Sequence, residues 1–445
     1  MKRPDVDIIT LGCAKNLVDS ERLMGMIRDL GLTVRHDPSP EQSPASIVVI
    51  NTCGFIADAK EESINTILSY CTDGSTKSVS KPDVVVMGCL SQRYADELPA
   101  EIPEVSAWFG KFDFDSVVKY IADKKRILHH ADRRAERNVT TGPSHAYIKI
   151  AEGCNRYCAF CAIPLITGRY KSRTIEDIVA EVKSLVNQGF TEFNIIAQDL
   201  SSYGLDLYGE HRLTELINSI SEIEEVKWIR LHYAYPADFP YDILPVIREN
   251  PKVCKYLDIA LQHISDPVLS NMRRHFSSQQ TIELIDRIRR EVPGIHLRTT
   301  LMVGFPGEGE AEFNQLLDFV KEARFERMGA FAYSEEDDTF AAKNLSDDIS
   351  ESVKAERLDQ LMKLQEKISA ELHEKKVGKT LQVVIDREED GYYVGRTEFD
   401  SPEVDPEVLI EKMDSSGNPI KLIPGQYYNV NIKSSLPFEL LACVS

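Results

Sequence analysis

The sequence lacks the features that mark membrane-spanning and exported proteins. None of its apolar runs approaches the roughly 20 residues that a membrane-spanning helix needs. The opening segment, Met1-Lys2-Arg3-Pro4-Asp5, leads directly into a strand-like run and has no apolar signal-peptide core. Nine cysteines without an export signal indicate a reducing compartment, in which thiols bind metals or take part in redox chemistry. We therefore expect a cytoplasmic protein without a membrane partner.

Positive charge is also scarce. The 445 residues include 52 Lys and Arg against 71 Asp and Glu, which gives a net charge of −19. Proteins that bind nucleic acids generally carry a basic footprint. The charge therefore argues against that class and permits a basic protein partner, of which ribosomal proteins are the obvious example. The hydrophobic content of 42% is ordinary for a globular protein, and the length predicts about two to four domains.

A fourth cysteine is missing from the densest cysteine cluster. Cys154, Cys158 and Cys161 lie within eight residues, and the next cysteine is Cys254. A zinc site would need a fourth Cys or His at short spacing, and a buried group of structural thiols is the other alternative. Three thiolates on a four-iron cluster would leave one iron open, and that iron could chelate S-adenosylmethionine for radical chemistry. The spacing, with Phe160 just before the last cysteine, resembles the signature of the radical-SAM superfamily.

Three other cysteines follow strand-like runs in the first predicted domain, residues 1 to 135. Expected strands and helices alternate in the order 6–11, 16–30, 47–50, 58–70, 83–87 and 92–98. This alternation predicts an open parallel sheet with helices on its faces. Cys13, Cys53 and Cys89 each follow one of the strands, at the sheet edge where ligands gather. We predict that they converge and bind a second cluster. A free cysteine is often only a small buried residue, and we keep that interpretation for Cys71, Cys254 and Cys443.

The segments around these cysteines resemble the N-terminal domain of the methylthiotransferases, namely Gly12-Cys13-Ala14-Lys15-Asn16, Asn51-Thr52-Cys53-Gly54-Phe55 and Gly88-Cys89. These radical-SAM enzymes insert sulfur at a carbon centre and then methylate it. The resemblance extends over essentially the whole chain. It implies two 4Fe-4S clusters and S-adenosylmethionine as cofactors, with the sulfur held at the open iron of the N-terminal cluster. It also implies a sulfur donor, an electron donor, and two open iron sites that face one cavity.

The second predicted domain, residues 140 to 345, follows a polar linker at 132–143. Six strand-like runs alternate with helices, at 146–151, 192–197, 226–231, 256–261, 295–303 and 327–333. Six such units predict a partial (β/α)6 barrel in which the Cys154 loop follows the first strand. Phe160 and polar residues of the strands are candidates for binding S-adenosylmethionine, although each could instead pack or cap the barrel. The polar candidates are Gln198, Asp199, His232, Gln262, His263, Arg298 and Ser334.

A connecting helix at 346–376 and short strands at 377–445 complete the chain. The strands, punctuated by Gly and Pro, predict a small antiparallel β-barrel. It resembles the TRAM domain that closes methylthiotransferases and usually binds RNA. Residues 386–414 hold eleven acidic and three basic side chains, whereas RNA binding needs cations. We predict that this segment attracts a basic protein, unless the charges are only a solvated face. The predicted substrate-binding residues are Glu398, Asp400, Glu403 and Asp405.

Residues 396–405 also resemble the branch of the family that modifies a ribosomal protein rather than tRNA. This resemblance implies that the enzyme adds a methylthio group to the β-carbon of an aspartate in the basic ribosomal protein S-twelve. A second S-adenosylmethionine would supply the methyl group. A tRNA adenosine is the alternative substrate, which the acidic tail disfavours. An iron–sulfur carrier or electron-transfer protein is the alternative class, but it has little use for a six-unit barrel with polar strand ends.

Overall fold

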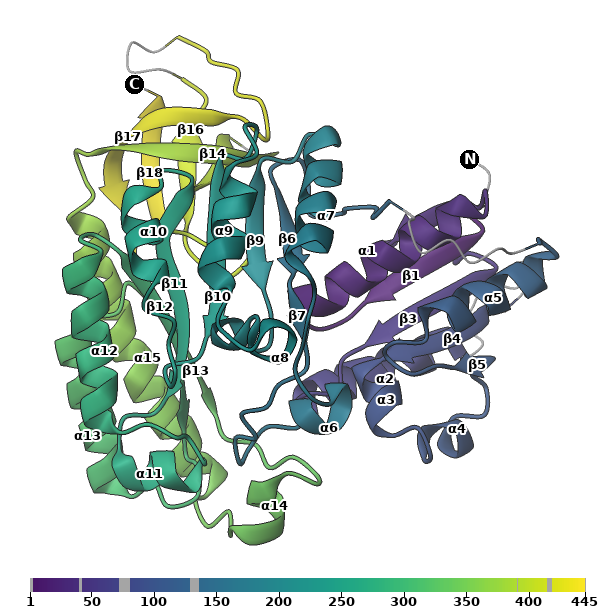
Figure 1. Ribbon diagram of the computed structural model, residues 1–445, viewed down its shortest axis with the longest axis horizontal. Coiled ribbons are helices and arrows are strands. Elements are labelled where there is room, and N and C mark those ends of the chain that lie inside the picture. Colours follow the sequence, from purple (N-terminus) through teal and green to yellow (C-terminus); the bar gives the residue numbers. More distant parts are fainter. Residues whose placement is uncertain are drawn as a thin grey trace. The chain divides into compact units, whose positions relative to one another are not determined.

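Strands and helices alternate through two parallel sheets before the chain ends in a small β-barrel (Figure 1). The computed structural model describes residues 3–39, 42–71, 81–128, 136–389, 391–413 and 418–444. Part of the predicted linker (132–135), Asp390 and Asp414 lie outside these ranges. Unit 1 comprises Met1–Thr140, Gly153–Asn155 and Cys161–Arg169, and unit 2 comprises Thr141–Glu152, Arg156–Phe160 and Tyr170–Ser445. In the described ranges, every helix is too short or too polar to cross a membrane.

Unit 1 contains a five-stranded parallel sheet in the order β2-β1-β3-β4-β5. Its strands are β1 (Val6–Thr10), β2 (Val34–His36), β3 (Ile47–Thr52), β4 (Asp83–Gly88) and β5 (Ala107–Trp108). Its helices are α1 (Ala14–Asp29), α2 (Ala57–Cys71), α3 (Cys89–Arg93), α4 (Leu98–Glu101), α5 (Phe114–Lys125) and α6 (Ile163–Thr167). The predicted open parallel sheet is confirmed, whereas the helix expected at 92–98 is replaced by the separate short helices α3 and α4.

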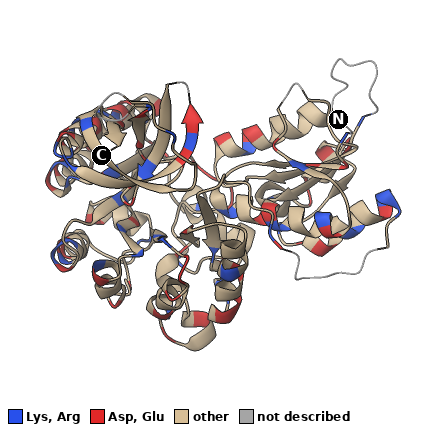
Figure 2. Cartoon of the chain, turned by 90° about the horizontal axis from the view of Figure 1, so that it is seen from above, with Lys and Arg blue, Asp and Glu red and all other residues tan. Residues whose placement is uncertain are grey.

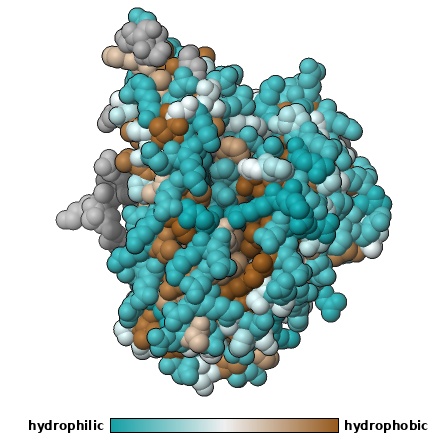
Figure 3. All heavy atoms as spheres, turned by 90° about the vertical axis from the view of Figure 1, so that its left-hand side faces the viewer, coloured by the Kyte–Doolittle hydropathy of each residue, from teal (hydrophilic) through white to brown (hydrophobic). Residues whose placement is uncertain are grey.

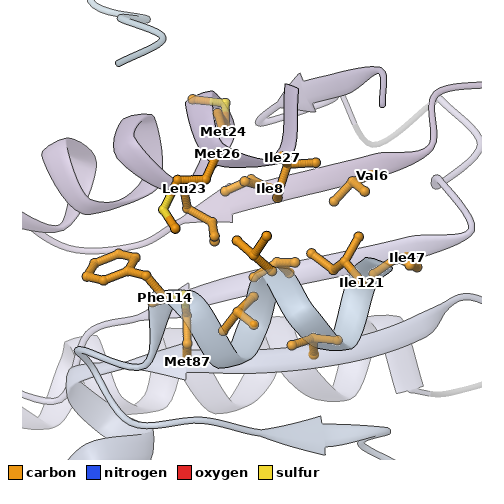
Figure 4. Packing of buried hydrophobic residues seen from close by; sticks show 14 residues of the cluster. Val6, Ile8, Leu23, Met24, Met26, Ile27, Ile47, Met87, Phe114 and Ile121 are labelled. Carbon is orange, nitrogen blue, oxygen red and sulfur yellow. The ribbon is translucent and has the colours of Figure 1, made fainter. Parts of the chain in front are cut away.

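Helices cover both faces of this sheet because its central strands are apolar on both sides. On one face, α1 and α5 pack against β1, β3 and β4, and Leu23 and Ile121 are fully buried there. Figure 4 shows these side chains meeting in one layer between the helices and the sheet. On the other face, α2, α3 and α4 cover Val48 and Val84. Each fully buried aliphatic side chain contributes roughly 1.5–3 kcal/mol.

Unit 2 begins with a six-stranded parallel sheet in the order β13-β12-β11-β10-β9-β6. These strands are β6 (His145–Lys149), β9 (Glu192–Ile196), β10 (Trp228–Ala234), β11 (Val253–Gln262), β12 (His296–Val303) and β13 (Arg327–Ala332). A two-stranded ribbon, β7 (Ala151–Glu152) and β8 (Lys171–Ser172), follows β6. The longer helices are α7 (Ile175–Asn187), α9 (Leu213–Ser221), α10 (Ile243–Glu249), α12 (Ser278–Glu291), α13 (Glu310–Ala323) and α15 (Glu351–Glu374). The shorter ones are η1 (Leu200–Ser202), α8 (Leu205–Tyr208), α11 (Asp266–Asn271) and α14 (Phe340–Asn344).

The six predicted strand–helix units are confirmed, but strand boundaries differ, most of all at the end of β10 and the start of β11. β10 runs to Ala234 and β11 begins at Val253, so His232 and Cys254 lie within strands. Cys254 is buried beside Trp228. A parallel strand that is buried on both faces reads as a continuous apolar run. Where such a strand begins and ends depends on its hydrogen bonds to neighbouring strands, and the apolar run alone does not show these bonds. Figure 3 shows the side of unit 2 that carries α12 and α13, where hydrophilic residues predominate.

The chain ends in a closed five-stranded barrel with the order β14-β15-β16-β18-β17. Its strands are β14 (Thr380–Glu389), β15 (Tyr392–Thr397), β16 (Glu407–Glu411), β17 (Tyr427–Ser435) and β18 (Glu439–Val444). The predicted barrel is confirmed, with one correction: β16 and β18 pair in parallel. An odd number of strands in a closed ring cannot alternate direction throughout, so one parallel pair is required. The last strand, β18, buries Cys443.

Ion pairs join this barrel to the amino ends of the parallel strands in unit 2. Arg396 of β15 contacts Glu192, the first residue of β9, at 2.9 Å. Arg327, the first residue of β13, pairs with Asp400, and Arg298 of β12 pairs with Asp405 at 2.9 Å. These charges are almost fully buried, except that Arg298 retains partial exposure. The barrel therefore lies at the end of the sheet opposite to the carboxyl ends of its strands.

Two histidines at this junction predict acid-sensitive stability. Burial lowers the pKa of both His145 and His373 to about 4, and the charges of Arg396 and Arg327 respectively add to the effect. An unfolded histidine has a pKa of about 6.5. The unfolded chain therefore binds more protons between about pH 6.5 and pH 4, and stability falls as the pH is lowered through that window. We expect a loss of about 3 kcal/mol per histidine at most.

The measurement is the urea midpoint of unfolding between pH 7 and pH 4. The His145→Gln/His373→Gln variant should show a flatter pH dependence than the natural chain, and His36 and His296, whose pKa values burial also lowers, account for part of the remaining slope. Identical slopes in both proteins would contradict the assignment.

Candidate metal centres

Three loops of unit 1 bring Cys13, Cys53 and Cys89 to the carboxyl edge of the parallel sheet. Cys13 precedes α1 as its N-cap, Cys53 directly follows β3, and Cys89 begins α3. Gly12 allows the first two loops to approach each other. It has a φ of +92°, and a Cβ atom there would lie only 2.9 Å from the Cys53 Sγ atom. A side chain at this position would displace the thiol.

Asn16 of α1 connects all three loops. Its Nδ2 atom donates to the backbone oxygens of Leu11 and Thr52, both at 3.0 Å. Its Oδ1 atom accepts from the Cys89 thiol at 3.5 Å and from the Lys111 ammonium at 3.0 Å. The loops are thus held in place by the protein's own hydrogen bonds.

The surroundings of the three thiols affect their acidity in opposite directions. Burial raises the pKa of Cys53, and it raises that of Cys89 to about 11. At Cys13, desolvation is outweighed by the Lys15 charge, by backbone N–H groups at the start of α1 and by Lys111, so that its pKa is lowered. The three thiols also affect one another, since the charge of Cys13 raises the pKa of the other two. They are therefore close neighbours.

The donor set fits an iron–sulfur cluster better than a single ion. No three Cys, His, Asp or Glu side chains among the described residues are placed to hold one metal ion. A cluster has a different requirement, because each thiolate binds a different iron and the sulfur atoms therefore stand farther apart. Three neighbouring thiols are soft donors of the kind that such clusters use. Their role as ligands stays a prediction.

The loop with Cys154, Cys158 and Cys161 lies between β7 and α6, after the first strand of the unit 2 sheet. Cys154 and Cys161 are grouped with unit 1 and Cys158 with unit 2. Within unit 2, the half-buried Cys158 accepts a hydrogen bond from the Arg274 guanidinium at 3.6 Å. Arg274 also lies over the Tyr235 ring, 4.3 Å from its centroid. The Arg274 guanidinium therefore helps to hold the Cys158 sulfur in position within unit 2.

Asp199 anchors this loop instead of facing solvent. Its carboxylate accepts from the Arg156 Nε atom at 2.7 Å and from the Ser201 backbone N–H at 3.0 Å. Arg156 lies within the cysteine loop, between Cys154 and Cys158. These contacts indicate that Asp199 positions the loop that carries Cys154, Cys158 and Cys161. The role predicted for Asp199 from the sequence was cofactor binding.

Gln198 and Gln262 retain the property expected of cofactor-binding residues. Gln262 ends β11 and Gln198 lies two residues beyond β9, both at the carboxyl edge of the sheet. Within the described part of the chain, the buried Oε1 atom of each accepts no hydrogen bond. A buried polar atom without a partner is costly, so these oxygens suit the polar groups of S-adenosylmethionine. Phe160 packs edge-on against Phe305 at 6.2 Å between centroids, as part of an apolar cluster.

The contacts of His263 and Arg298 differ from those predicted. The His263 Nε2 atom lies 3.2 Å from Glu308, and its Nδ1 atom accepts from the Ser265 backbone at 3.0 Å. Both ring nitrogens are therefore used within the protein. Arg298 lies in the amino-terminal half of β12 and pairs with Asp405. It is directed to the C-terminal barrel rather than to the carboxyl edge of the sheet.

Most of the acidic residues predicted to bind substrate make contacts within the protein. The Asp400 and Asp405 side chains are each 1% exposed and paired with arginines, and Glu398 accepts from the Lys255 backbone at 3.2 Å. Glu403 remains exposed. Elsewhere on the barrel, acidic side chains pair with basic ones, such as Glu407 with Arg387. Figure 2 shows the two signs of charge interspersed in this part of the chain. The charge count overstated the exposed acidic surface because it could not show which carboxylates are paired.

Lys111 and Arg274 were not identified from the sequence. Each is a single basic residue far along the chain from the cysteines that it approaches. Only the Lys111-containing loop after β5 and the Arg274-containing segment after α11 bring these charges to the thiols. No sequence signal distinguished them from solvated surface residues.

Three family models match the chain. The Radical SAM superfamily matches residues 148–320, the Uncharacterized protein family UPF0004 matches 5–110, and the TRAM domain matches 377–444. These matches cover both cysteine sets and the C-terminal barrel.

Curated relatives match over nearly their full length. The chain is 56% identical over 442 residues to the ribosomal protein uS12 methylthiotransferase RimO of Porphyromonas gingivalis, covering 99% of both chains. It is 55% identical to the RimO protein of Phocaeicola vulgatus, with 100% of both chains covered.

A solved structure shares the fold. The radical S-adenosylmethionine methyltransferase TsrM from Kitasatospora setae, with cobalamin and a 4Fe-4S cluster bound, matches with a TM-score of 0.52 and 16% identity. The match covers 74% of this chain and 75% of that chain. At this identity the likeness concerns the fold alone. The full-length sequence identity decides membership: the chain belongs to the RimO family of ribosomal protein uS12 methylthiotransferases.

Proposed function

We propose that this protein is a radical S-adenosylmethionine enzyme that adds a methylthio group to the β-carbon of an aspartate in ribosomal protein uS12. The observation that carries the proposal is the presence of two separate three-cysteine sets: one follows three strands of the unit 1 sheet, and the other lies in the loop between β7 and α6. Each set offers three ligands to a four-iron cluster and leaves one iron for a group that is not protein. Similarity to named uS12 methylthiotransferases over the whole chain supports the same function.

The chain's residues have distinct tasks in this proposal. Cys154, Cys158 and Cys161 would hold a cluster that supplies the electron for cleaving S-adenosylmethionine, and Cys13, Cys53 and Cys89 would hold a cluster that supplies the sulfur. Arg274 positions the Cys158 sulfur by a hydrogen bond, and Asp199 holds the loop through Arg156. The open amide oxygens of Gln198 and Gln262 orient the cofactor.

The partners follow from this chemistry. One electron must enter for each cleavage, and the transferred sulfur must be replaced, so an electron donor and a sulfur donor are required. The substrate is a basic protein rather than tRNA, because the chain carries a net charge of −19 and phosphate binding needs cations. Reducing conditions in the cytoplasm would keep the nine cysteines available to iron.

The test is an anaerobic reconstitution followed by turnover. Iron and sulfide are counted, and the enzyme is incubated with reductant, S-adenosylmethionine and either uS12 or tRNA. We expect about eight irons per chain, release of 5′-deoxyadenosine, and a methylthio mass gain on uS12. A gain on tRNA instead would refute the substrate, and about four irons would refute the second cluster. A reaction without S-adenosylmethionine is the control.

A further inference from the structure

The buried Lys111 ammonium group lies near the Cys13, Cys53 and Cys89 thiols, and the function proposed above gives it no role. The Lys111 side chain is only 2% exposed, and its Nζ atom donates to the Asp19 carboxylate at 2.9 Å and to the Asn16 Oδ1 atom at 3.0 Å. Asp19 is 5% exposed and belongs to α1, as does Asn16. The pair is therefore inside unit 1, at the carboxyl edge of its sheet.

Asn16 links the Lys111 charge to a thiol of this set. Its Oδ1 atom accepts from the Lys111 ammonium at 3.0 Å and from the Cys89 thiol at 3.5 Å. The Asp19 carboxylate pairs with the same ammonium at 2.9 Å. One cation and one anion thus lie in the hydrogen-bonded surroundings of the Cys89 sulfur.

Stability alone gives no reason for an ion pair at this position. Burying two charges costs several kcal/mol of desolvation, and a well-packed apolar pair would often be as stable. Any cluster bound by three thiolates would be negatively charged, and reduction adds one electron to it. A buried cation stabilises the more negative, reduced form, because the low local dielectric leaves its charge poorly screened.

We propose that the Lys111–Asp19 pair sets the reduction potential of the cluster bound by Cys13, Cys53 and Cys89, with Lys111 raising it and Asp19 lowering it. The inference rests on the proposed presence of that cluster. Lys111 acts as a positioning residue, because it contacts Asn16, the residue that connects the three loops, and not the reacting atoms.

Opposite shifts in potential distinguish this role from a purely structural one. In a Cys154→Ala/Cys158→Ala/Cys161→Ala background, the full chain carries only the N-terminal cluster. Its midpoint potential is measured by dithionite titration followed by electron paramagnetic resonance, together with iron content. We expect Lys111→Met to shift the midpoint to more negative values and Asp19→Asn to shift it to more positive values.

Arg35→Met provides the matched control. Arg35 pairs at 2.8 Å with the fully buried Asp7 of β1 in the same sheet. Asp7 lies near the amino end of β1, whereas Cys13 follows the carboxyl end, so this variant breaks a comparable pair away from the thiols. Its midpoint should equal that of the background protein.

Each outcome separates the inference from the proposed function. Equal midpoints in all variants, or shifts of Lys111→Met and Asp19→Asn in the same direction, would overturn the role of the pair while leaving the cluster intact. If Lys111→Met binds no iron, the test rests on Asp19→Asn. A midpoint potential of Asp19→Asn equal to that of the background protein would then overturn the inference. A background protein that binds no cluster at all would refute the proposed function itself, and with it this inference.

Discussion

Replacing Cys154 with alanine should abolish cleavage of S-adenosylmethionine, whereas replacing Cys53 should leave cleavage intact and stop sulfur transfer. The two cysteines belong to different sets. Cys154 lies in the loop after the first strand of the unit 2 sheet, and Cys53 follows β3 in unit 1. Loss of one of three thiolates leaves a second iron without a protein ligand, so each variant should lose its own cluster and retain about four irons.

The measurement separates the two activities of one enzyme. Release of 5′-deoxyadenosine reports cleavage, and the mass of uS12 reports methylthio transfer. Cys154→Ala should show neither above background, and Cys53→Ala should show only the first. Cys254→Ala, which removes a buried thiol of β11 that belongs to neither set, is the matched control and should retain both. The same defect in Cys154→Ala and Cys53→Ala would contradict the division of tasks.

Replacing Asp400 with alanine should destabilise the attachment of the C-terminal barrel to the sheet by about 3–5 kcal/mol, because it leaves a buried guanidinium unpaired. Asp400 accepts from Arg327 and Thr397, and both charged side chains are 4% exposed or less. Burial raises the pKa of Asp400, but the charges of Arg327 and Lys376 outweigh it and hold the pKa well below its usual range. The carboxylate is therefore charged throughout the physiological range.

Urea unfolding, with hydrogen exchange to locate the change in β14–β18, measures this loss. The double variant Arg327→Met/Asp400→Leu removes both charges and should recover much of the lost stability, since an apolar pair can replace a buried ion pair. Glu389→Ala breaks the exposed pair with Arg387 on the same barrel and should leave the midpoint unchanged. An unchanged midpoint in Asp400→Ala would show that the pair does not hold the barrel in place.

The sequence alone predicted the alternation of the main strands and helices and two candidate sets of cysteine ligands. The spacing of Cys154, Cys158 and Cys161 is local, so it can be read without a fold. The alternation of apolar strands and amphipathic helices predicted both parallel sheets. It also placed Cys13, Cys53 and Cys89 at one edge, because parallel strands share their direction.

Only the tertiary structure decided which charges meet. Lys111 reaches Asp19 across 92 positions, and Arg327 reaches Asp400 across 73. No periodicity in the chain encodes such pairs, and a net charge does not distinguish a paired carboxylate from an exposed one. The acidic C-terminal segment therefore seemed a surface for a basic partner, although Asp400 and Asp405 are buried against arginines of the sheet. Local patterns determined where the candidate cysteine ligands lie in the fold, and long-range packing determined which side chains surround them.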